Sequence, residues 1–326
     1  MSNKQRLEHL RTLEMQGLWA GWTAAMSRDL SWRRMFAGAI SDAVLKFVVN
    51  STNLSLPSED NKRRWGFASA GSKCFLVNPQ TGEACGTTHP TVLHVLSGCK
   101  AALEQGRYTW RHNSLLLVFK QHLIAHIGAI NSGRLKLSSS KPLRFVSADG
   151  RLYNNGSSAP SLAPTQLVDY LARAHDWELR FDLPGDRFSY NVFPPEIATT
   201  SERPDILLLS KSEKMIVCIE LTSPSEERLH AAHTLKASKY EHLTPDALIN
   251  GWRLTTWPIE VGCRGCVAFS VSKMLRALRL PPTQQLIIKQ QLEDVAIRCS
   301  YYIFCSRTTP SWDDRPMLVP GGPPRI

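Results

Sequence analysis

The segment RPDILLLSKSEKMIVCIELT, residues 203–222, decides the fold, because it reads as two apolar strands joined by a polar turn. Asp205 begins the first strand and Glu220 ends the second. One face of the second strand carries four alternate residues, Ile216, Cys218, Glu220 and Thr222. A hairpin would therefore bring two carboxylates to neighbouring strand ends, one of them in an otherwise apolar row.

The helix expected next, over residues 226–243, carries lysines on its packing face. At about 100° per residue, Lys236 and Lys239 share a sector with apolar residues. Two adjacent carboxylates repel unless a cation lies between them, and oxygen ligands suit Mg²⁺. We therefore expect Asp205 and Glu220 to bind Mg²⁺, and Lys239 or Lys236 to activate a water for attack on a phosphate. Lys239 is favoured because it directly precedes Tyr240. A helix rotated slightly would instead leave both lysines on a solvated edge.

This constellation resembles the PD-(D/E)XK nuclease superfamily and, more narrowly, the restriction-like endonuclease of site-specific non-LTR retrotransposons. Pro204-Asp205 is followed by Glu220 and then by KASKY, residues 236–240. Thr222 stands where the superfamily motif has lysine, and in the retrotransposon branch that lysine comes from the following helix.

The resemblance implies an α+β fold with an α/β nuclease core, in which helices flank a mixed sheet. It implies a Mg²⁺-dependent DNA endonuclease that nicks a target site. The chain contains no aromatic-x-Asp-Asp turn of a polymerase. Priming of DNA synthesis from the nick would therefore need a reverse transcriptase in trans.

Four potential metal ligands occur in a stretch rich in Gly, Thr and Pro: Cys74, Cys85, His94 and Cys99. Three thiols and an imidazole suit tetrahedral Zn²⁺, and the spacing of His94 and Cys99 is typical of a zinc knuckle. The ten residues between the first two cysteines are a long gap for a metal turn. His89 is an alternative ligand, and three unrelated thiols in a loop are the alternative interpretation.

Residues 91–116, TVLHVLSGCKAALEQGRYTWRHNSLL, are similar to the segment that links knuckle and endonuclease in the same family. Its basic, aromatic and amide side chains suit phosphates and bases: Arg107, Tyr108, Trp110, Arg111, His112 and Asn113. A second basic run, Lys62, Arg63 and Arg64, lies in residues 45–66, which resemble the family's upstream linker. We expect both groups to contact DNA. Alternatively, the aromatic residues belong to the core face of an amphipathic helix.

The charge distribution agrees with a division between binding and chemistry. The 326 residues carry a formal charge of +11. Residues 1–150 hold 19 basic and 9 acidic residues, whereas residues 151–326 hold 20 basic and 19 acidic residues. The basicity therefore lies almost wholly in the first 150 residues, as expected when one part of a protein binds a polyanion.

We expect four parts: a helical basic linker region (1–73), a zinc knuckle with a basic aromatic helical segment (74–135), a restriction-like endonuclease domain (141–309) and a disordered tail (310–326). Polar residues interrupt the longest apolar stretch, 115–130, so no bilayer span is expected. The N-terminus lacks the apolar region of a secretory signal, so we expect an intracellular, nuclear protein.

The rival hypothesis is a catalytically inactive nucleic-acid-binding remnant that keeps the knuckle and the basic half of the chain. A third hypothesis is an RNA-binding module, because knuckles and stacking aromatics also suit single strands. The oligomeric state does not follow from the sequence.

Overall fold

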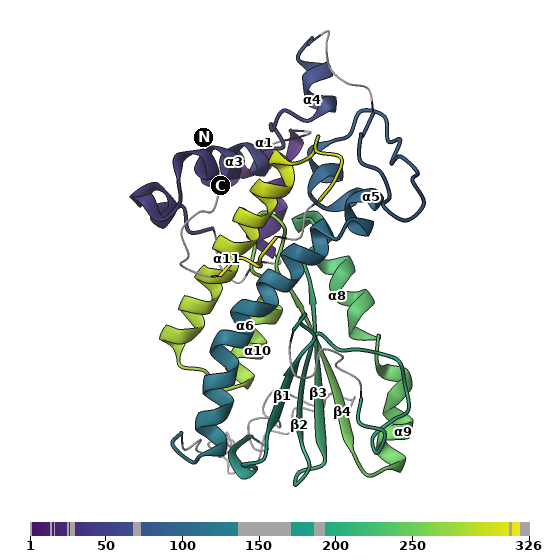
Figure 1. Cartoon of the computed structure of the whole chain (residues 1–326). Coiled ribbons are helices and arrows are strands. Elements are labelled where there is room, and N and C mark those ends of the chain that lie inside the picture. The colour runs from purple at the N-terminus through teal and green to yellow at the C-terminus, as the bar shows by residue number, and fades with distance from the viewer. Residues whose placement is uncertain are drawn as a thin grey trace.

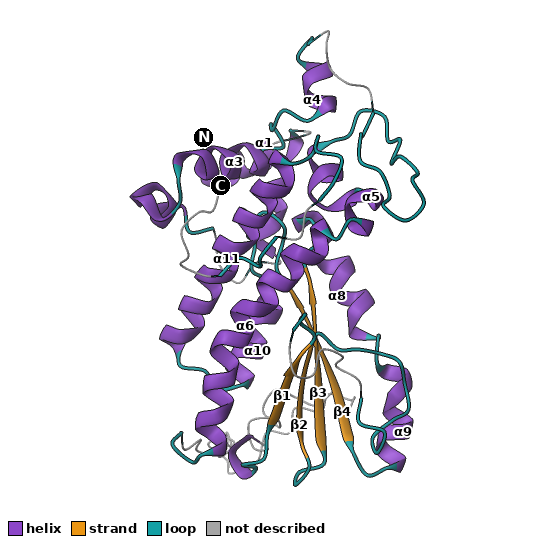
Figure 2. Cartoon of the chain, viewed as in Figure 1, coloured by secondary structure: helices purple, strands orange, loops and turns teal. Residues whose placement is uncertain are grey.

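The computed structural model describes residues 2–13, 15, 17–24, 26, 30–67, 73–135, 171–185, 193–312 and 315–319. It is a mixed α+β structure in which helices cover both faces of a four-stranded sheet (Figure 2). The junction predicted between residues 135 and 141 lies outside the described residues.

The sheet contains the predicted hairpin at its centre. Its strands lie in chain order: β1 (Glu178–Phe181), β2 (Ile206–Ser210), β3 (Met215–Thr222) and β4 (Arg253–Glu260). Strands β1, β2 and β3 pair antiparallel, and β4 pairs parallel to β3. Ile206 lies opposite Ile219. The Cα atoms of Asp205 and Glu220, one step beyond that pair, are therefore on facing positions of the two strands.

Both faces of the sheet are buried, which explains why β2 reads as an unbroken apolar run. Alternation along β3 separates the two sides: Val217 and Ile219 join the larger core, whereas Ile216 and Cys218 join a smaller one with Tyr240. The shared face predicted for Ile216, Cys218 and Glu220 is thus confirmed.

Three helices cover the larger core: α6 (Arg107–Asn131), α10 (Phe269–Ala277) and α11 (Pro282–Cys305). Helices α6 and α11 run side by side along their length (Figure 1). The predicted boundary near residue 140 does not separate two cores, because apolar residues of α6 pack in the same core as the sheet.

The other face of the sheet is covered by α8 (Leu229–Ala237), η5 (Glu241–Leu243) and α9 (Thr244–Ile249), after the short turn η4 (Glu226–Arg228). The single helix predicted over residues 226–243 is therefore interrupted. A turn at residues 238–240 separates α8 from η5.

Short helices build the N-terminal part: α1 (Asn3–Thr12), η1 (Leu18–Ala24), α2 (Trp32–Arg34), η2 (Met35–Ala39), α3 (Asp42–Thr52), α4 (Glu59–Arg64), η3 (His94–Gly98) and α5 (Lys100–Glu104). A break separates η2 from α3, because Gly38 has φ 90° and Ser41 caps α3. A third core joins this part to Leu229, Cys263 and Ile297. None of the described helices has the length and apolar character needed to cross a bilayer.

The prediction of a disordered tail is wrong for its described residues. The Trp110 indole donates to the carbonyl of Pro316 at 3.1 Å, and the amide of Leu318 donates to Ser114 Oγ at 3.1 Å. The Trp312 ring lies edge-on to Trp110 with centroids 5.5 Å apart. The aromatic contact and backbone bonds hold this segment along α6, which proline composition alone did not reveal.

Candidate active site and metal centre

Glu220 is a buried carboxylate held by three donors from the segment after α8. It is 1% exposed. Lys236 Nζ lies 2.8 Å from Oε2, and Lys239 Nζ lies 3.1 Å from each carboxylate oxygen. The hydroxyl of Tyr240 also donates to Oε1. Both lysines that the sequence predicts therefore contact Glu220. Their ammonium groups compensate the charge of the carboxylate, because an unpaired buried charge is costly.

The two lysines reach Glu220 from different backbone settings. Lys236 belongs to the last turn of α8, whereas Lys239 lies in the turn that follows it. The helical wheel predicts that Lys239 lies on the same side as Lys236. Lys239 does contact Glu220, but from a turn and not from the helix. Burial and the hydrogen bond to Glu220 raise the pKa of Tyr240, which keeps this hydroxyl a donor to the carboxylate.

Asp205 is held by groups from β3 and α6. Its Oδ2 accepts the backbone N–H of Leu221 at 2.7 Å, and His112 Nε2 lies 3.3 Å from the same oxygen. No described residue donates to Oδ1. Burial raises the pKa of Asp205, but the imidazole, the Leu221 amide and Lys236 outweigh it, so the pKa is lowered and the carboxylate stays ionised. The influence of Lys236 shows that this ammonium acts on both acids.

His112 was predicted to contact nucleic acid, and the structure places it at the acid pair instead. Its Nδ1 lies 3.2 Å from Asn113 Oδ1, so Asn113 contacts the imidazole that lies beside Asp205. Burial lowers the pKa of His112, but the charge of Asp205 and the hydrogen bonds raise it by a larger amount, so the net shift is upward. Helix α6 thus connects the knuckle segment to the strand ends.

A third buried acid on the same sheet face was missed at the sequence level. Glu260, 2% exposed, ends β4, and its Oε2 accepts from Ser270 Oγ at 2.6 Å. Its Oε1 lies 2.9 Å from His233 Nδ1. His233 precedes Lys236 by one turn of α8, so the i, i+3 spacing of the two side chains was an available signal.

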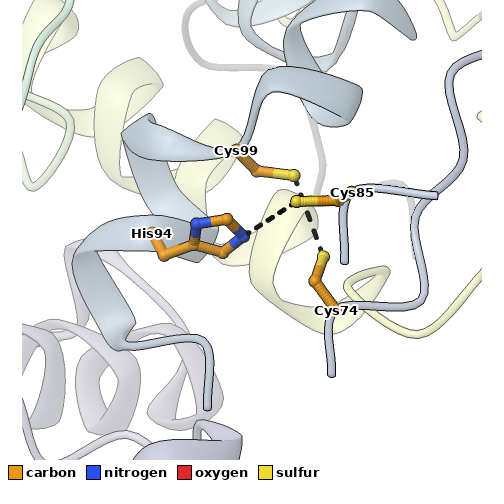
Figure 3. A group of neighbouring side chains, drawn as sticks. All are labelled: Cys74, Cys85, His94 and Cys99. Atoms are coloured by element: carbon orange, nitrogen blue, oxygen red, sulfur yellow. Dashed lines mark hydrogen bonds between the residues drawn. The ribbon is translucent and has the colours of Figure 1, made fainter. Parts of the chain in front are cut away.

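The predicted metal ligands converge in space: Cys74, Cys85, His94 and Cys99 (Figure 3). All four ligand atoms lie within 4.8 Å of one another. The Sγ atoms of Cys74 and Cys99 are 3.8 Å apart, and Cys85 Sγ lies 3.6 Å from His94 Nε2. Tetrahedral zinc, with bonds of about 2.3 Å to sulfur and about 2.0 Å to nitrogen, spaces its ligands by roughly 3.5–3.8 Å. The cluster could therefore hold a metal ion such as zinc.

A hairpin explains the long gap between the first two cysteines. The amide of Cys74 donates to Thr87 O at 2.8 Å, and the amide of Cys85 donates to Leu76 O at 2.8 Å. The two sulfurs therefore meet although ten residues separate them. The alternative ligand His89 is not part of the cluster. A hydrogen bond from Cys99 lowers the pKa of the Cys74 thiol to about 4, against the effect of burial, so one thiolate is present to receive a metal.

Most of the basic aromatic segment faces inward, which contradicts its predicted role in DNA contact. Arg107 and Arg111 are 0% and 1% exposed. Arg107 donates to the carbonyls of Ser306 and Thr309, and Arg111 donates to Leu96 O at 2.8 Å. Side chains without accessible surface cannot bind a ligand.

The two aromatic residues of that segment are also used within the protein. The Tyr108 hydroxyl donates to Val95 O at 2.9 Å and accepts the amide of Cys99 at 3.1 Å. Trp110 is 8% exposed and packs on the tail. The alternative interpretation, in which the aromatics of an amphipathic helix are core, is the one that the structure supports.

The basic run on α4 remains on the surface. Lys62 pairs with Glu59 at 2.8 Å, and Arg63 and Arg64 pair with Asp60 at 3.2 and 3.0 Å. The side chains of Arg63 and Arg64 keep 55% and 43% of their surface exposed.

Two exposed aromatic rings follow α4. Trp65 and Phe67 are 50% and 58% exposed, and their ring centroids lie 6.4 Å apart. Bases stack on exposed aromatic rings next to basic residues in many nucleic-acid-binding proteins. This composition and exposure make the end of α4 the better candidate surface for nucleic acid.

Neither a scan against models of known protein families nor a search among curated proteins finds a match for this chain.

Proposed function

We propose that this protein is a Mg²⁺-dependent DNA endonuclease with a PD-(D/E)XK nuclease core, derived from a retrotransposon and acting by nicking a target site in the nucleus. The observation that carries the proposal is the buried Glu220, which faces Asp205 across the β2–β3 hairpin and is contacted by Lys236 and Lys239. A carboxylate pair at strand ends with lysines on the covering segment is the arrangement that this chemistry needs.

Asp205 and Glu220 are the residues that would hold the magnesium ion. Oδ1 of Asp205 accepts no bond from a described residue, and the Glu220 carboxylate would offer an oxygen once one of its ammonium partners moves away. Bound there, the ion would polarise a phosphate oxygen and lower the pKa of a bound water. Lys236, which contacts Glu220 and lowers the pKa of Asp205, would orient the attacking water or stabilise the charge that develops on the phosphate.

The rest of the chain would hold the DNA. Zinc at Cys74, Cys85, His94 and Cys99 would stabilise the knuckle next to α5. The exposed basic residues of α4, with Trp65 and Phe67, would bind phosphates and unpaired bases. The partner that would extend the nick is a reverse transcriptase acting in trans.

The test compares nicking of supercoiled plasmid by the purified protein with Mg²⁺ and with EDTA. Asp205→Ala should abolish the Mg²⁺-dependent nicking, whereas Asp246→Ala, a matched change at an exposed position of α9, should not. Equal nicking by wild type and Asp205→Ala, or none by either, would contradict the catalytic proposal.

A specific observation favours the second candidate, a nucleic-acid-binding protein without catalysis. Both oxygens of Glu220 already accept bonds from Lys236, Lys239 and Tyr240. A carboxylate so fully occupied has no free oxygen for a metal unless an ammonium moves. This candidate predicts DNA binding that weakens steeply with salt and no cleavage. Competition between duplex DNA and single-stranded RNA would separate it from an RNA-binding module.

A further inference from the structure

A large cavity lies next to the acid pair and has no role in the function proposed above. Its volume is about 990 Å³, and its walls come from η1, η4, α8, the end of β4 and the start of α10. Two of its lining residues connect it to the acid pair. Pro258 lies beside Glu220 in the β3–β4 register, and His233 lies one helical turn before Lys236.

One wall of the cavity orients an imidazole. Glu260 is buried and hydrogen bonds fix its position: Ser270 Oγ donates to one oxygen, and the other lies 2.9 Å from His233 Nδ1. A carboxylate accepts, so Nδ1 carries the hydrogen and Nε2 of the neutral ring is left with its lone pair. No described residue bonds to that Nε2. The ring is 45% exposed and can accept a hydrogen bond from a ligand N–H.

The carboxylates at the other wall, Glu226 and Glu227, are both held by Arg264. Glu226 accepts the amide of Arg264 at 2.7 Å and its Nε at 2.6 Å, and Glu227 accepts from Nη2 of the same guanidinium at 2.5 Å. Lys273, in contrast, is exposed and makes no ion pair with any described residue. Arg264 offsets one of these two negative charges, and Lys273 is the one ammonium group among the described residues that line the cavity, so a phosphate would bind beside it.

An aromatic ring completes the site. Phe269 begins α10 at the cavity and is 47% exposed, so its ring is accessible to a ligand. An acceptor nitrogen, an ammonium and an exposed ring match the three parts of a nucleotide: the N–H edge of the base, the phosphate and the π face of the base. The volume is at the upper end for sites that enclose a small molecule, so one nucleotide fits with room for its neighbours.

We propose that this cavity binds an unpaired nucleotide of a DNA substrate, with its base on Phe269 and His233 and its phosphate at Lys273. The proposal deepens the nuclease assignment and rests on it, because it names DNA with a single-stranded segment beside the acid pair as the substrate class. A continuous duplex keeps its bases stacked inside and has none to offer the cavity.

The test measures binding, not cleavage, so that it does not depend on nuclease activity. Fluorescence polarisation in EDTA compares two labelled probes, a short DNA duplex and the same duplex with a single-stranded overhang. Wild type should bind the overhang probe more tightly. Phe269→Ala and Lys273→Gln should each weaken that binding by about five- to twentyfold and leave duplex binding unchanged, since each removes one contact to the unpaired nucleotide.

Two matched variants control for loss of an exposed ring and of an exposed charge. Phe36→Ala removes a ring that is 66% exposed on η2, and Lys211→Gln removes a lysine from the β2–β3 turn, at the opposite end of the sheet. Neither should change the preference. Equal affinity of wild type for both probes, or an equal loss on both probes in the cavity variants, would overturn the proposal. So would tighter binding of an RNA overhang. Absence of nicking alongside an intact preference would contradict only the catalytic function.

Discussion

Lys236 Nζ lies 2.8 Å from Oε2 of Glu220, a carboxylate that is 1% exposed. The lysine itself keeps 27% of its side chain in contact with solvent. The carboxylate of this pair is therefore buried, whereas the ammonium is partly exposed to solvent. The ammonium can move away into solvent, but the carboxylate cannot. This asymmetry is what a metal-binding acid with a mobile cationic neighbour requires.

Removal of the Glu220 charge should destabilise the protein. Glu220→Gln keeps the shape but leaves two ammonium groups facing a neutral amide, so we expect a loss of about 2–3 kcal/mol, less than for a fully buried pair because solvent reaches both lysines. Urea denaturation measures the loss. The control, Glu213→Gln, breaks an exposed pair with Arg173 and should cost less than about 1 kcal/mol. Similar losses in both variants would show that the Glu220 cluster is not a special electrostatic centre.

The two lysines should differ in their effect on catalysis. Both contact Glu220, but Lys236 also lowers the pKa of Asp205, and Lys239 has a second partner in Glu202 at 3.7 Å. We expect Lys236→Met to reduce plasmid nicking by at least about a hundredfold and Lys239→Met by about tenfold or less, as for groups that act directly or indirectly on the reacting phosphate. Initial rates with saturating Mg²⁺ measure both. A larger loss in Lys239→Met would restore the preference that its position before Tyr240 suggested.

The sequence predicted the central hairpin because alternation along β3 and the polar turn before it are local signals. It also predicted the convergence of Lys236 on Glu220, since helix periodicity relates residues that are close in the chain. It could not distinguish Arg107 and Arg111 inside the core from DNA-binding arginines, because their partners, such as Ser306 O, lie about 200 residues away. Composition is the same for a buried and an exposed guanidinium, and only long-range packing separates them.

The cysteine cluster should bind zinc and stabilise the knuckle. Cys85→Ser removes one of three thiolate ligands, and metal analysis should find about one zinc ion per wild-type chain and much less in the variant. The thermal midpoint should fall on treatment with a chelator, because metal binding is coupled to folding of such small sites. Cys305→Ser, at an exposed cysteine outside the cluster, is the control. Equal zinc content in the two variants would refute the assignment of Cys85 as a ligand.

His126 should make the stability depend on pH. Burial lowers its pKa below the ordinary value of 6.5, despite its hydrogen bond to Leu278 O. The unfolded chain therefore binds the proton more readily, so the contribution to stability is complete above pH 6.5 and is lost as the pH falls from there toward the lower folded pKa. Urea midpoints should decline over this range in wild type and decline less in His126→Gln. His9→Gln, at an exposed position of α1, should behave like wild type.

A single methyl group at Gly262 should disturb the network that joins the N-terminal part to the sheet. A Cβ there would overlap the buried carboxylate of Glu226, which holds the backbone and side chain of Arg264. That guanidinium in turn lies 4.3 Å from the centroid of the Trp22 ring and donates to Ser51 O at 3.3 Å. Gly262→Ala should therefore cost about 1–3 kcal/mol through overpacking, measured by urea denaturation.

The N-terminal part should also become more sensitive to protease in that variant, because its contacts with Arg264 are loosened. Gly128→Ala is the matched control: it lies within α6, and a Cβ there meets no atom within 4 Å. In a helix interior this change should leave stability unchanged or raise it by up to about 1 kcal/mol. If Gly262→Ala were as stable and as resistant to protease as Gly128→Ala, the Glu226 carboxylate would have room to move, and Arg264 would not be the link between the two parts.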